Sequence, residues 1–154
     1  SSDVCSSDLV KAFKKRWYVI AHSPGTDDVR CYALDRMERV IISDKVFKMP
    51  KDLEPAEYFK DCFGIINNKD SEVQKVVLKV DAFQSNYIRN LPLHESQKEA
   101  KRTEEYSIFE YHLKPEFDFE QEIFSNMDAM EVLEPLWLRE EVKERIKNLA
   151  SKYL

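Results

Sequence analysis

The second half of the chain carries the pattern that most restricts its fold. Apolar runs that suit strands alternate there with amphipathic stretches that suit helices, in the order strand, helix, strand, strand, helix, strand. The expected strands are residues 73–80, 97–102, 106–113 and 130–133, and the expected helices are residues 82–90 and 115–127. This order is typical of the ferredoxin-like βαββαβ fold, in which two helices cover one face of an antiparallel sheet.

A last helix is expected from about residue 137 to residue 153. Its apolar residues recur every three or four positions and form one face: Leu138, Val142, Ile146, Leu149 and Tyr153. Glu141 and Arg145 lie four positions apart, where they can form a weak ion pair. The apolar face needs a surface to pack on, which is either the sheet of the same chain or a second subunit.

The first half contains strand signals and one short helix. Residues 15–22 and 29–36 are rich in aromatic and β-branched side chains and are separated by a cluster of turn-forming residues, so a hairpin is expected. A third strand is expected near residues 39–42. A helix is expected at residues 54–64, since Pro55 suits its first turn and Gly64 its end. The whole chain is therefore expected to be α+β.

Composition and spacing argue against several classes of function. Two glycines are too few for a glycine-rich phosphate loop, and no apolar run reaches the roughly 18–20 residues that span a bilayer. No secretory signal is visible, and three scattered cysteines do not make a disulfide framework, so we expect a cytoplasmic protein with reduced thiols. No HExxH or CxxC spacing is present, so neither a metal nor another cofactor is expected.

The sequence does not predict an enzyme. His94, Glu95 and Ser96 superficially resemble a hydrolase dyad, but they lack a nucleophile elbow, and adjacent residues on an extended segment point apart. We interpret His94 and Ser96 as loop residues that hydrogen-bond the backbone. The carboxylates of residues 116–122 are interpreted as a solvated helix face.

Two segments near the N-terminus resemble the WYL domain. They read Arg-Trp-Tyr-Val-Ile-Ala at residues 16–21 and Arg-Cys-Tyr-Ala-Leu-Asp-Arg-Met at residues 30–37. Val19 replaces the family's leucine, Ala33 a commoner arginine and Met37 a commoner isoleucine. Three later segments resemble the C-terminal extension called WCX: residues 63–65, 91–97 and 132–139.

This resemblance implies a domain order and a kind of partner. A WYL domain is a small SH3-like or Sm-like β-barrel, and full-length relatives carry an N-terminal winged helix-turn-helix that binds operator DNA. The barrel is implied to bind a regulatory ligand, often nucleic acid, and the WCX part to contribute to a homodimer and to pass the signal. The chain is expected to begin with a non-native tail at residues 1–8, which resembles a translated sequencing adapter. A partial WYL domain that lacks its first strands is expected at residues 9–50, a helical connector at residues 51–71 and a WCX-like domain at residues 72–154.

The basic and aromatic residues of the two WYL segments are the candidate ligand site. Residues 9–50 hold nine Lys or Arg against five Asp or Glu, so this half can attract an anion. Alternation along strands groups side chains by face, and arginines beside tyrosines suit single-stranded nucleic acid, since guanidinium binds phosphate and rings stack on bases. The predicted ligand contacts are Arg16, Tyr18, Arg30, Tyr32 and Arg36.

Purely structural interpretations of the same residues remain open. Trp17, Val19 and Ala21 suit a hydrophobic core, and both tyrosines suit half-buried core positions.

The favoured function is effector sensing within a bacterial transcriptional regulator, with a nucleic acid or a nucleotide-like molecule as the ligand. The alternatives are a dimerisation module without a ligand and a sensor of a small metabolite in the second domain. An exposed apolar face on the last helix favours the first alternative, and an apolar pocket outside the basic strands favours the second.

Overall fold

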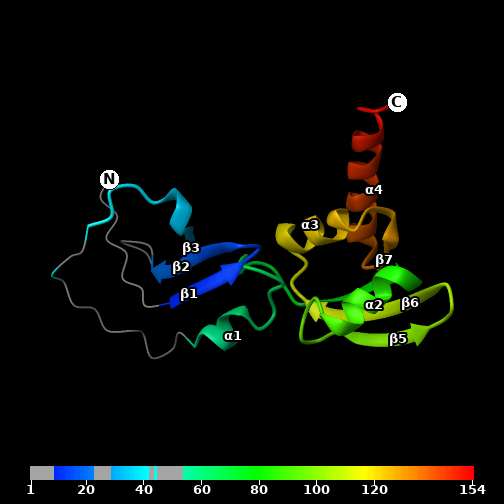
Figure 1. Cartoon of the computed structure of the whole chain (residues 1–154), viewed down its shortest axis with the longest axis horizontal. Coiled ribbons are helices and arrows are strands. Elements are labelled where there is room, and N and C mark those ends of the chain that lie inside the picture. Colours follow the sequence, from blue (N-terminus) through cyan, green and yellow to red (C-terminus); the bar gives the residue numbers. More distant parts are fainter. Residues whose placement is uncertain (1–8, 23–28, 42–43, 45–53) are drawn as a thin grey trace. The chain divides into compact units, whose positions relative to one another are not determined.

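The computed structural model describes residues 9–22, 29–41, 44 and 54–154 (Figure 1). The chain divides into two compact units between Lys60 and Asp61. The first unit contains a three-stranded antiparallel sheet, and the second a four-stranded antiparallel sheet with helices. The predicted α+β class is confirmed.

The sheet of the first unit is a meander of three strands. They are β1 (Leu9–Phe13), β2 (Arg16–His22) and β3 (Val29–Ala33). Lys14 and Lys15 join β1 to β2 with positive φ angles of 45° and 65°, the left-handed backbone that a tight two-residue hairpin turn requires. The predicted hairpin of β2 and β3 is confirmed. The sequence does not predict β1, because Lys11 lies among its apolar residues.

The chain beyond β3 differs from the prediction. A 3₁₀ helix, η1 (Leu34–Arg36), follows Ala33 directly, so the strand ends three residues earlier than expected. The strand predicted near residues 39–42 is wrong for residues 39–41, and residue 42 lies outside the described residues. Arg39 has a φ of 53°, which an extended strand does not tolerate. The described strands form an open sheet and do not close a barrel, as expected of a partial one.

The second unit has the predicted ferredoxin-like order. Its elements are β4 (Gln74–Asp81), α2 (Ala82–Asn90), β5 (Lys98–Arg102), β6 (Tyr106–Leu113), α3 (Phe117–Ser125), the 3₁₀ helix η2 (Met127–Ala129) and β7 (Met130–Glu134). The sheet order is β5-β6-β4-β7, and every neighbouring pair is antiparallel. Asp81 caps the first turn of α2, where its carboxylate accepts a hydrogen bond from the backbone N–H of Gln84 at 2.7 Å.

Alternate residues of the central strands build the core. Val76 lies opposite Tyr111 and Leu78 opposite Phe109, so these four side chains share one face of the sheet. Buried residues of both helices pack against this face: Ile88 of α2, and Phe119 and Ile123 of α3. Apolar side chains recur at every second residue of β4 and β6 and therefore gather on one face of the sheet, which explains why both helices cover that face.

The first residues of the second unit pack on the rest of that unit. The helix α1 (Pro55–Phe59) is shorter than the predicted helix at residues 54–64, because Cys62 pairs with Lys114 as an isolated parallel bridge. The backbone N–H of Lys114 donates to the carbonyl of Asp61 at 2.8 Å. The buried carboxylate of Asp118 accepts hydrogen bonds from the backbone N–H groups of Ile65 and Ile66 at 2.9 and 3.3 Å.

The last helix, α4 (Leu136–Ala150), is attached to the core at its first turns. Leu138 is fully buried and Val142 packs against the core, whereas Ile146 and Leu149 are about half exposed. Figure 1 shows the helix extending away from the sheet toward the C-terminus. The predicted pair of Glu141 and Arg145 is confirmed at 3.0 Å.

Arg145 also fastens α4 to α3. Its guanidinium lies 2.8 Å from the carboxylate of Glu120, which is only 6% exposed. The expected solvated face of α3 is therefore wrong for Glu120 and for Asp118, which is 7% exposed. Burial raises the pKa of Glu120, and the nearby Glu141 raises it further.

The loop between α2 and β5 confirms the structural interpretation of His94 and Ser96. The Ser96 hydroxyl accepts from the backbone N–H of His112 at 2.8 Å and donates to its carbonyl at 3.0 Å. Nδ1 of His94 lies 2.8 Å from the same hydroxyl. Both side chains therefore tie the loop to β6.

A bidentate ion pair joins α2 to the edge strand β5, and its removal gives a pH-dependent prediction. Arg89 contacts both carboxylate oxygens of Glu99 at 2.9 and 2.6 Å, and the hydroxyl of Ser107 donates to this carboxylate at 2.7 Å. Chiefly because of the Arg89 contact, the pKa of Glu99 falls from 4.5 to about 2. The stabilisation is therefore present above pH 4.5 and is lost as pH falls toward 2.

We expect Glu99→Gln to lower the free energy of unfolding by about 1 to 2 kcal/mol at pH 7, since the pair is partly exposed and screened by solvent. Urea titrations between pH 7 and pH 2.5 should show this difference shrinking as pH falls. Glu104→Gln, which removes the same charge from the exposed turn between β5 and β6, should change little. A pH-independent difference for Glu99→Gln would contradict the assigned role of the ion pair.

Candidate functional site

The strand register divides the predicted ligand-binding residues between two faces of the first sheet. Residues directly opposite each other in an antiparallel pair share a face. Tyr18 lies opposite both Lys11 and Ala33, whereas Tyr32 lies opposite Val19. Tyr18 and Val19 are adjacent on β2 and point to opposite sides, so the two tyrosines do too. One face, here the Lys11 face, carries Arg16 and Tyr18; the other, the Trp17 face, carries Arg30 and Tyr32.

Charged groups of the Lys11 face have partners within the first unit. Nζ of Lys11 lies 3.8 Å from the centre of the Phe59 ring in α1. Nε of Arg16 lies 3.3 Å from the Asp35 carboxylate, in a pair whose side chains are about half exposed. Ile20, on the same face, is 2% exposed. This face therefore serves packing.

The Trp17 face is more open. Trp17 and Val10 are each 57% exposed, Arg30 is exposed and Tyr32 is half-buried. Because Val19 pairs with Tyr32, Trp17 is a diagonal neighbour of Tyr32, within the reach of aromatic side chains. The expectation that Trp17 belongs to the core is wrong, since more than half of its surface is exposed. The face combines two rings with one guanidinium, which can stack on bases and bind phosphate.

Arg36 does not continue the row of Arg30 and Tyr32. The expected alternation requires a strand up to residue 36, but β3 ends at Ala33 and Arg36 lies in η1. Its side chain is exposed. The structure therefore brings together Arg30 and Tyr32, adds Trp17 to them, and separates them from Arg16 and Tyr18.

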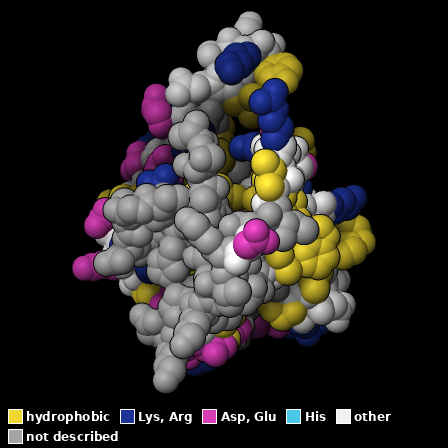
Figure 2. Space-filling model, turned by 90° about the vertical axis from the view of Figure 1, so that its left-hand side faces the viewer, with side chains coloured by type: hydrophobic (Ala, Val, Ile, Leu, Met, Phe, Trp, Pro, Cys, Tyr) yellow, Lys and Arg dark blue, Asp and Glu magenta, His cyan; other side chains and the backbone are white. Residues whose placement is uncertain are grey.

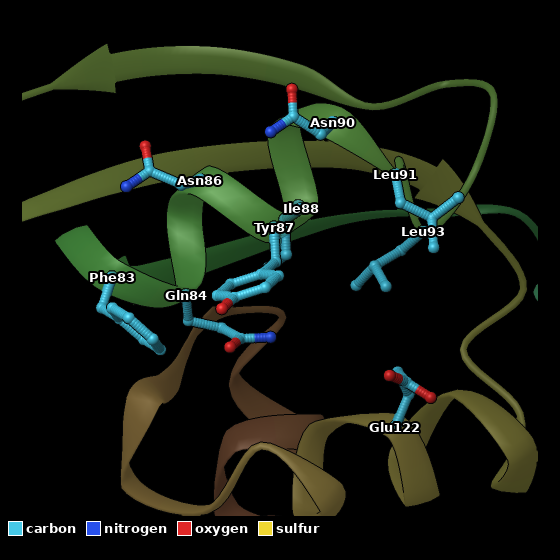
Figure 3. A pocket seen from close by; sticks show the side chains of 9 residues that line it. All are labelled: Phe83, Gln84, Asn86, Tyr87, Ile88, Asn90, Leu91, Leu93 and Glu122. Atoms are coloured by element: carbon cyan, nitrogen blue, oxygen red, sulfur yellow. The ribbon is translucent and has the colours of Figure 1, made fainter.

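A second candidate site is a hollow of about 490 Å³ between α2 and α3 in the second unit. Phe83 and Tyr87 lie four positions apart on α2, and Leu91 follows directly after its end. The three side chains are 70%, 58% and 79% exposed. Figure 3 shows Glu122 rising from α3 into the space below Leu93, while the amides of Asn86 and Asn90 point away from the hollow.

Hydrogen bonds of side-chain amides connect the two walls of this hollow. Nε2 of Gln84 on α2 donates to Oδ1 of Asn126 at 2.6 Å. Nδ2 of Asn126 donates to the backbone carbonyl of Glu122 at 2.8 Å and lies 3.4 Å from its carboxylate. The carboxylate is therefore positioned at the wall by a residue that also contacts α2.

Two domain families match this sequence. The WCX domain matches residues 72–150, just over half of the chain, and the WYL domain matches residues 8–42. The chain belongs to the WCX family. The resemblance inferred from the sequence segments is thereby confirmed, and both faces of the first sheet fall within the WYL match of this WCX-family protein.

The WCX-family chain is also similar to a solved structure, proteasome accessory factor B/C (PafBC) of Arthrobacter aurescens. The identity is 19%, the TM-score is 0.40, and the similarity covers 86% of this chain and 20% of the other. The chain therefore spans about a fifth of the length of that structure. No curated protein matches.

The hollow lies in the WCX domain, where the metabolite-sensor alternative expects an apolar pocket, but the sequence did not indicate which residues line it. The available signal is the spacing of Phe83, Tyr87 and Leu91, which puts an apolar stripe on α2 beside the buried Ile88. Among the residues that the structure describes, no group of three His, Cys, Asp or Glu side chains could hold a metal ion. Each helix in the described part of the WCX-family chain is too short or too polar to span a membrane.

Proposed function

We propose that this chain is the effector-sensing part of a cytoplasmic bacterial transcriptional regulator and not an enzyme. It binds a nucleic acid or a nucleotide-like effector on the Trp17 face and passes the signal to a DNA-binding domain of the same regulator. The observation that carries the proposal is that Trp17, Arg30 and Tyr32 lie on one open face of the WYL sheet. Two rings beside a guanidinium suit a single strand, whose bases stack while its phosphates pair with arginine.

Binding of a fluorescein-labelled single-stranded oligonucleotide to the full chain tests this proposal. Affinity should fall as salt rises, because phosphate binding releases counterions. Arg30→Ala should weaken binding roughly fivefold, since a solvent-exposed charged contact contributes about 1 kcal/mol. Arg16→Ala is the matched control: it removes the same charge from the Lys11 face and should leave binding nearly unchanged.

Two outcomes would contradict the proposal. Equal losses from Arg30→Ala and Arg16→Ala would indicate a non-specific field of positive charge. No binding at low salt, in a chain that circular dichroism shows to be folded, would exclude the nucleic-acid effector.

A second candidate function is homodimerisation without a ligand, and the last helix favours it. Ile146 and Leu149 remain 53% and 51% exposed beyond the turns of α4 that contact the core, and Tyr153 is 83% exposed. Figure 2 shows apolar and basic side chains together at the top of the view, where the end of α4 lies. An exposed apolar stripe on a helix is a surface that a second copy can cover.

A further inference from the structure

The hollow between α2 and α3 has the size and the apolar lining of a small-molecule site. Its volume of about 490 Å³ falls within the usual range for such sites, roughly 300 to 1,000 Å³. The rings of Phe83 and Tyr87 meet edge to face, with their centres 5.2 Å apart, and both remain more than half exposed. The other apolar lining residues are Ile88, Leu91 and Leu93. Two exposed rings in such a lining can pack against an aromatic ligand.

A glutamine behind the hollow fixes the backbone of two apolar lining residues. Nε2 of Gln97 donates to the backbone carbonyl of Ile88 at 2.9 Å, and Oε1 of Gln97 accepts from the backbone N–H of Leu93 at 3.0 Å. The hydroxyl of the fully buried Tyr111 donates to the same Oε1 at 3.0 Å. Ile88 and Leu93 are therefore tied to the core of the second unit, so this side of the hollow is formed before a ligand binds.

The amide of Gln84 presents an acceptor beside the two rings. Its Nε2 donates to Oδ1 of Asn126 at 2.6 Å, and Nδ2 of Asn126 donates in turn to the backbone carbonyl of Glu122 at 2.8 Å. This chain of hydrogen bonds fixes which way both amides face. Oε1 of Gln84 accepts no hydrogen bond from any residue that the structure describes. Figure 3 shows this amide below the ring of Tyr87, on the side toward α3.

The charges of the lining residues argue for an uncharged ligand. Among the described residues that line the hollow, none is Lys, Arg or His, so an anion would lose hydration without gaining a counter-ion. The lining carboxylate of Glu122 already lies 3.4 Å from Nδ2 of Asn126. An uncharged molecule gives up less hydration than an ion does, and a donor on it can pair with Gln84.

We propose that this hollow binds a small uncharged aromatic molecule that donates a hydrogen bond. The ring of the ligand packs against Phe83 and Tyr87, and its N–H or O–H group donates to Oε1 of Gln84. The chain therefore has a second effector site. This site lies in the WCX domain and shares no residue with the Trp17 face, so its test does not depend on nucleic-acid binding.

Three bicyclic probes of similar shape test the proposal: indole, benzofuran and indole-2-carboxylate. Indole donates an N–H, benzofuran has an oxygen at that position, and the third probe is an anion. Each is titrated into the full chain while the methyl signals of Ile88 and Leu93 are followed by NMR, with Ile20 of the first unit as the reference. Indole should move the first two signals and bind roughly two- to tenfold more tightly than benzofuran, the range that one neutral hydrogen bond allows. The anion should bind most weakly.

Variants of Gln84 and Tyr87 assign the two contacts. Gln84→Met keeps the length of the side chain and removes its acceptor, so it should lower the affinity of indole to that of benzofuran and leave the affinity of benzofuran unchanged. Gln84→Glu keeps an acceptor and should preserve the preference for indole. Tyr87→Leu should weaken the binding of both neutral probes roughly two- to tenfold. Tyr153→Leu makes the same change outside the hollow, at a position that is 83% exposed, and should alter neither.

The proposal is overturned if neither neutral probe moves the signals of Ile88 and Leu93, if indole and benzofuran bind equally, or if the preference for indole survives in Gln84→Met. If Gln84→Met loses both probes, Gln84→Glu decides: a retained preference for indole supports the proposal, and a lost preference overturns it. The proposal is also overturned if the two methyl signals move with protein concentration alone, because a second copy of the chain then covers the hollow.

Discussion

Replacing Asp118 by alanine is expected to lower the free energy of unfolding by about 3 to 5 kcal/mol. Asp118 is 7% exposed, and one of its carboxylate oxygens accepts from the backbone N–H groups of Ile65 and Ile66 at 2.9 and 3.3 Å. The other oxygen accepts from the backbone N–H of Phe119 at 3.0 Å. Hydrogen bonds to a charged group each contribute roughly 1.5 to 3 kcal/mol, and alanine removes those that the backbone N–H groups of Ile65 and Ile66 donate to Asp118. The N–H of Phe119 keeps a second acceptor, the carbonyl of Glu116 at 2.9 Å.

Urea unfolding followed by circular dichroism measures this loss, and two further variants make it specific. Asp118→Asn keeps one carbonyl oxygen and should lose about 1 to 2 kcal/mol. Asp70→Ala removes a carboxylate from an exposed position in the same connecting region and should stay within about 0.5 kcal/mol of the parent. A loss below about 1 kcal/mol for Asp118→Ala would show that the connector does not depend on this carboxylate.

Hydrogen exchange separates local release of the connector from general loss of stability. In Asp118→Asn, the amides of Ile65 and Ile66 should exchange faster than they do in the parent chain, because their acceptor is weakened. The core amides of β4 should exchange as in the parent, because the sheet persists. Ile65 and Ile66 lie just after the boundary at Lys60 and Asp61, so the hydrogen bonds of Asp118 attach the start of the second unit to α3.

The fold of the second unit could be predicted because its local signals agree with its packing. The helix predicted at residues 82–90 is α2, and the strand predicted at residues 106–113 is β6. Alternating burial in β6 and the aspartate cap of α2 are properties that a short stretch of sequence displays by itself. Signals of this kind do not depend on distant parts of the chain.

The arrangement of the predicted ligand residues on the two faces of the first sheet could not be predicted from such local signals. Alternation along one strand groups Arg30 with Tyr32 and Arg16 with Tyr18, and the structure agrees with both groupings. Whether the two groups share a face depends on the register between β2 and β3, and a slip of one residue would reverse it. The sequence of a long connection does not determine that register, so the division into two faces emerges only from the pairing.

The hollow in the WCX domain illustrates a different limit. Phe83 and Tyr87 come from α2, whereas Glu122 comes from α3, about forty residues later. Periodicity predicts that each helix has an apolar side, but it does not predict how far apart two helices lie on a sheet. The exposed stripe on α2 is therefore visible in the sequence, and the carboxylate that gives the hollow its charge is not.

The second large effect concerns the attachment of α4. Leu138 is the buried residue of this helix, fully enclosed in the core that β4, β6 and both packed helices build. Leu138→Ala is expected to lower the free energy of unfolding by about 3 kcal/mol, because it removes apolar contacts and leaves a cavity. Leu149→Ala makes the same change on the same helix at a position that is 51% exposed, and it should stay within about 0.5 kcal/mol.

Measuring both variants at several protein concentrations distinguishes attachment within one chain from contact between copies. If α4 depends on its own core, Leu138→Ala loses the same free energy at every concentration, since the lost contacts lie within one chain. If a second copy covers the outer turns, the loss from Leu149→Ala grows with concentration, because dimerisation then contributes to stability. A small effect of Leu138→Ala would contradict the packing of α4. A concentration-dependent effect of Leu149→Ala would instead favour the dimerisation module over a helix that stands free.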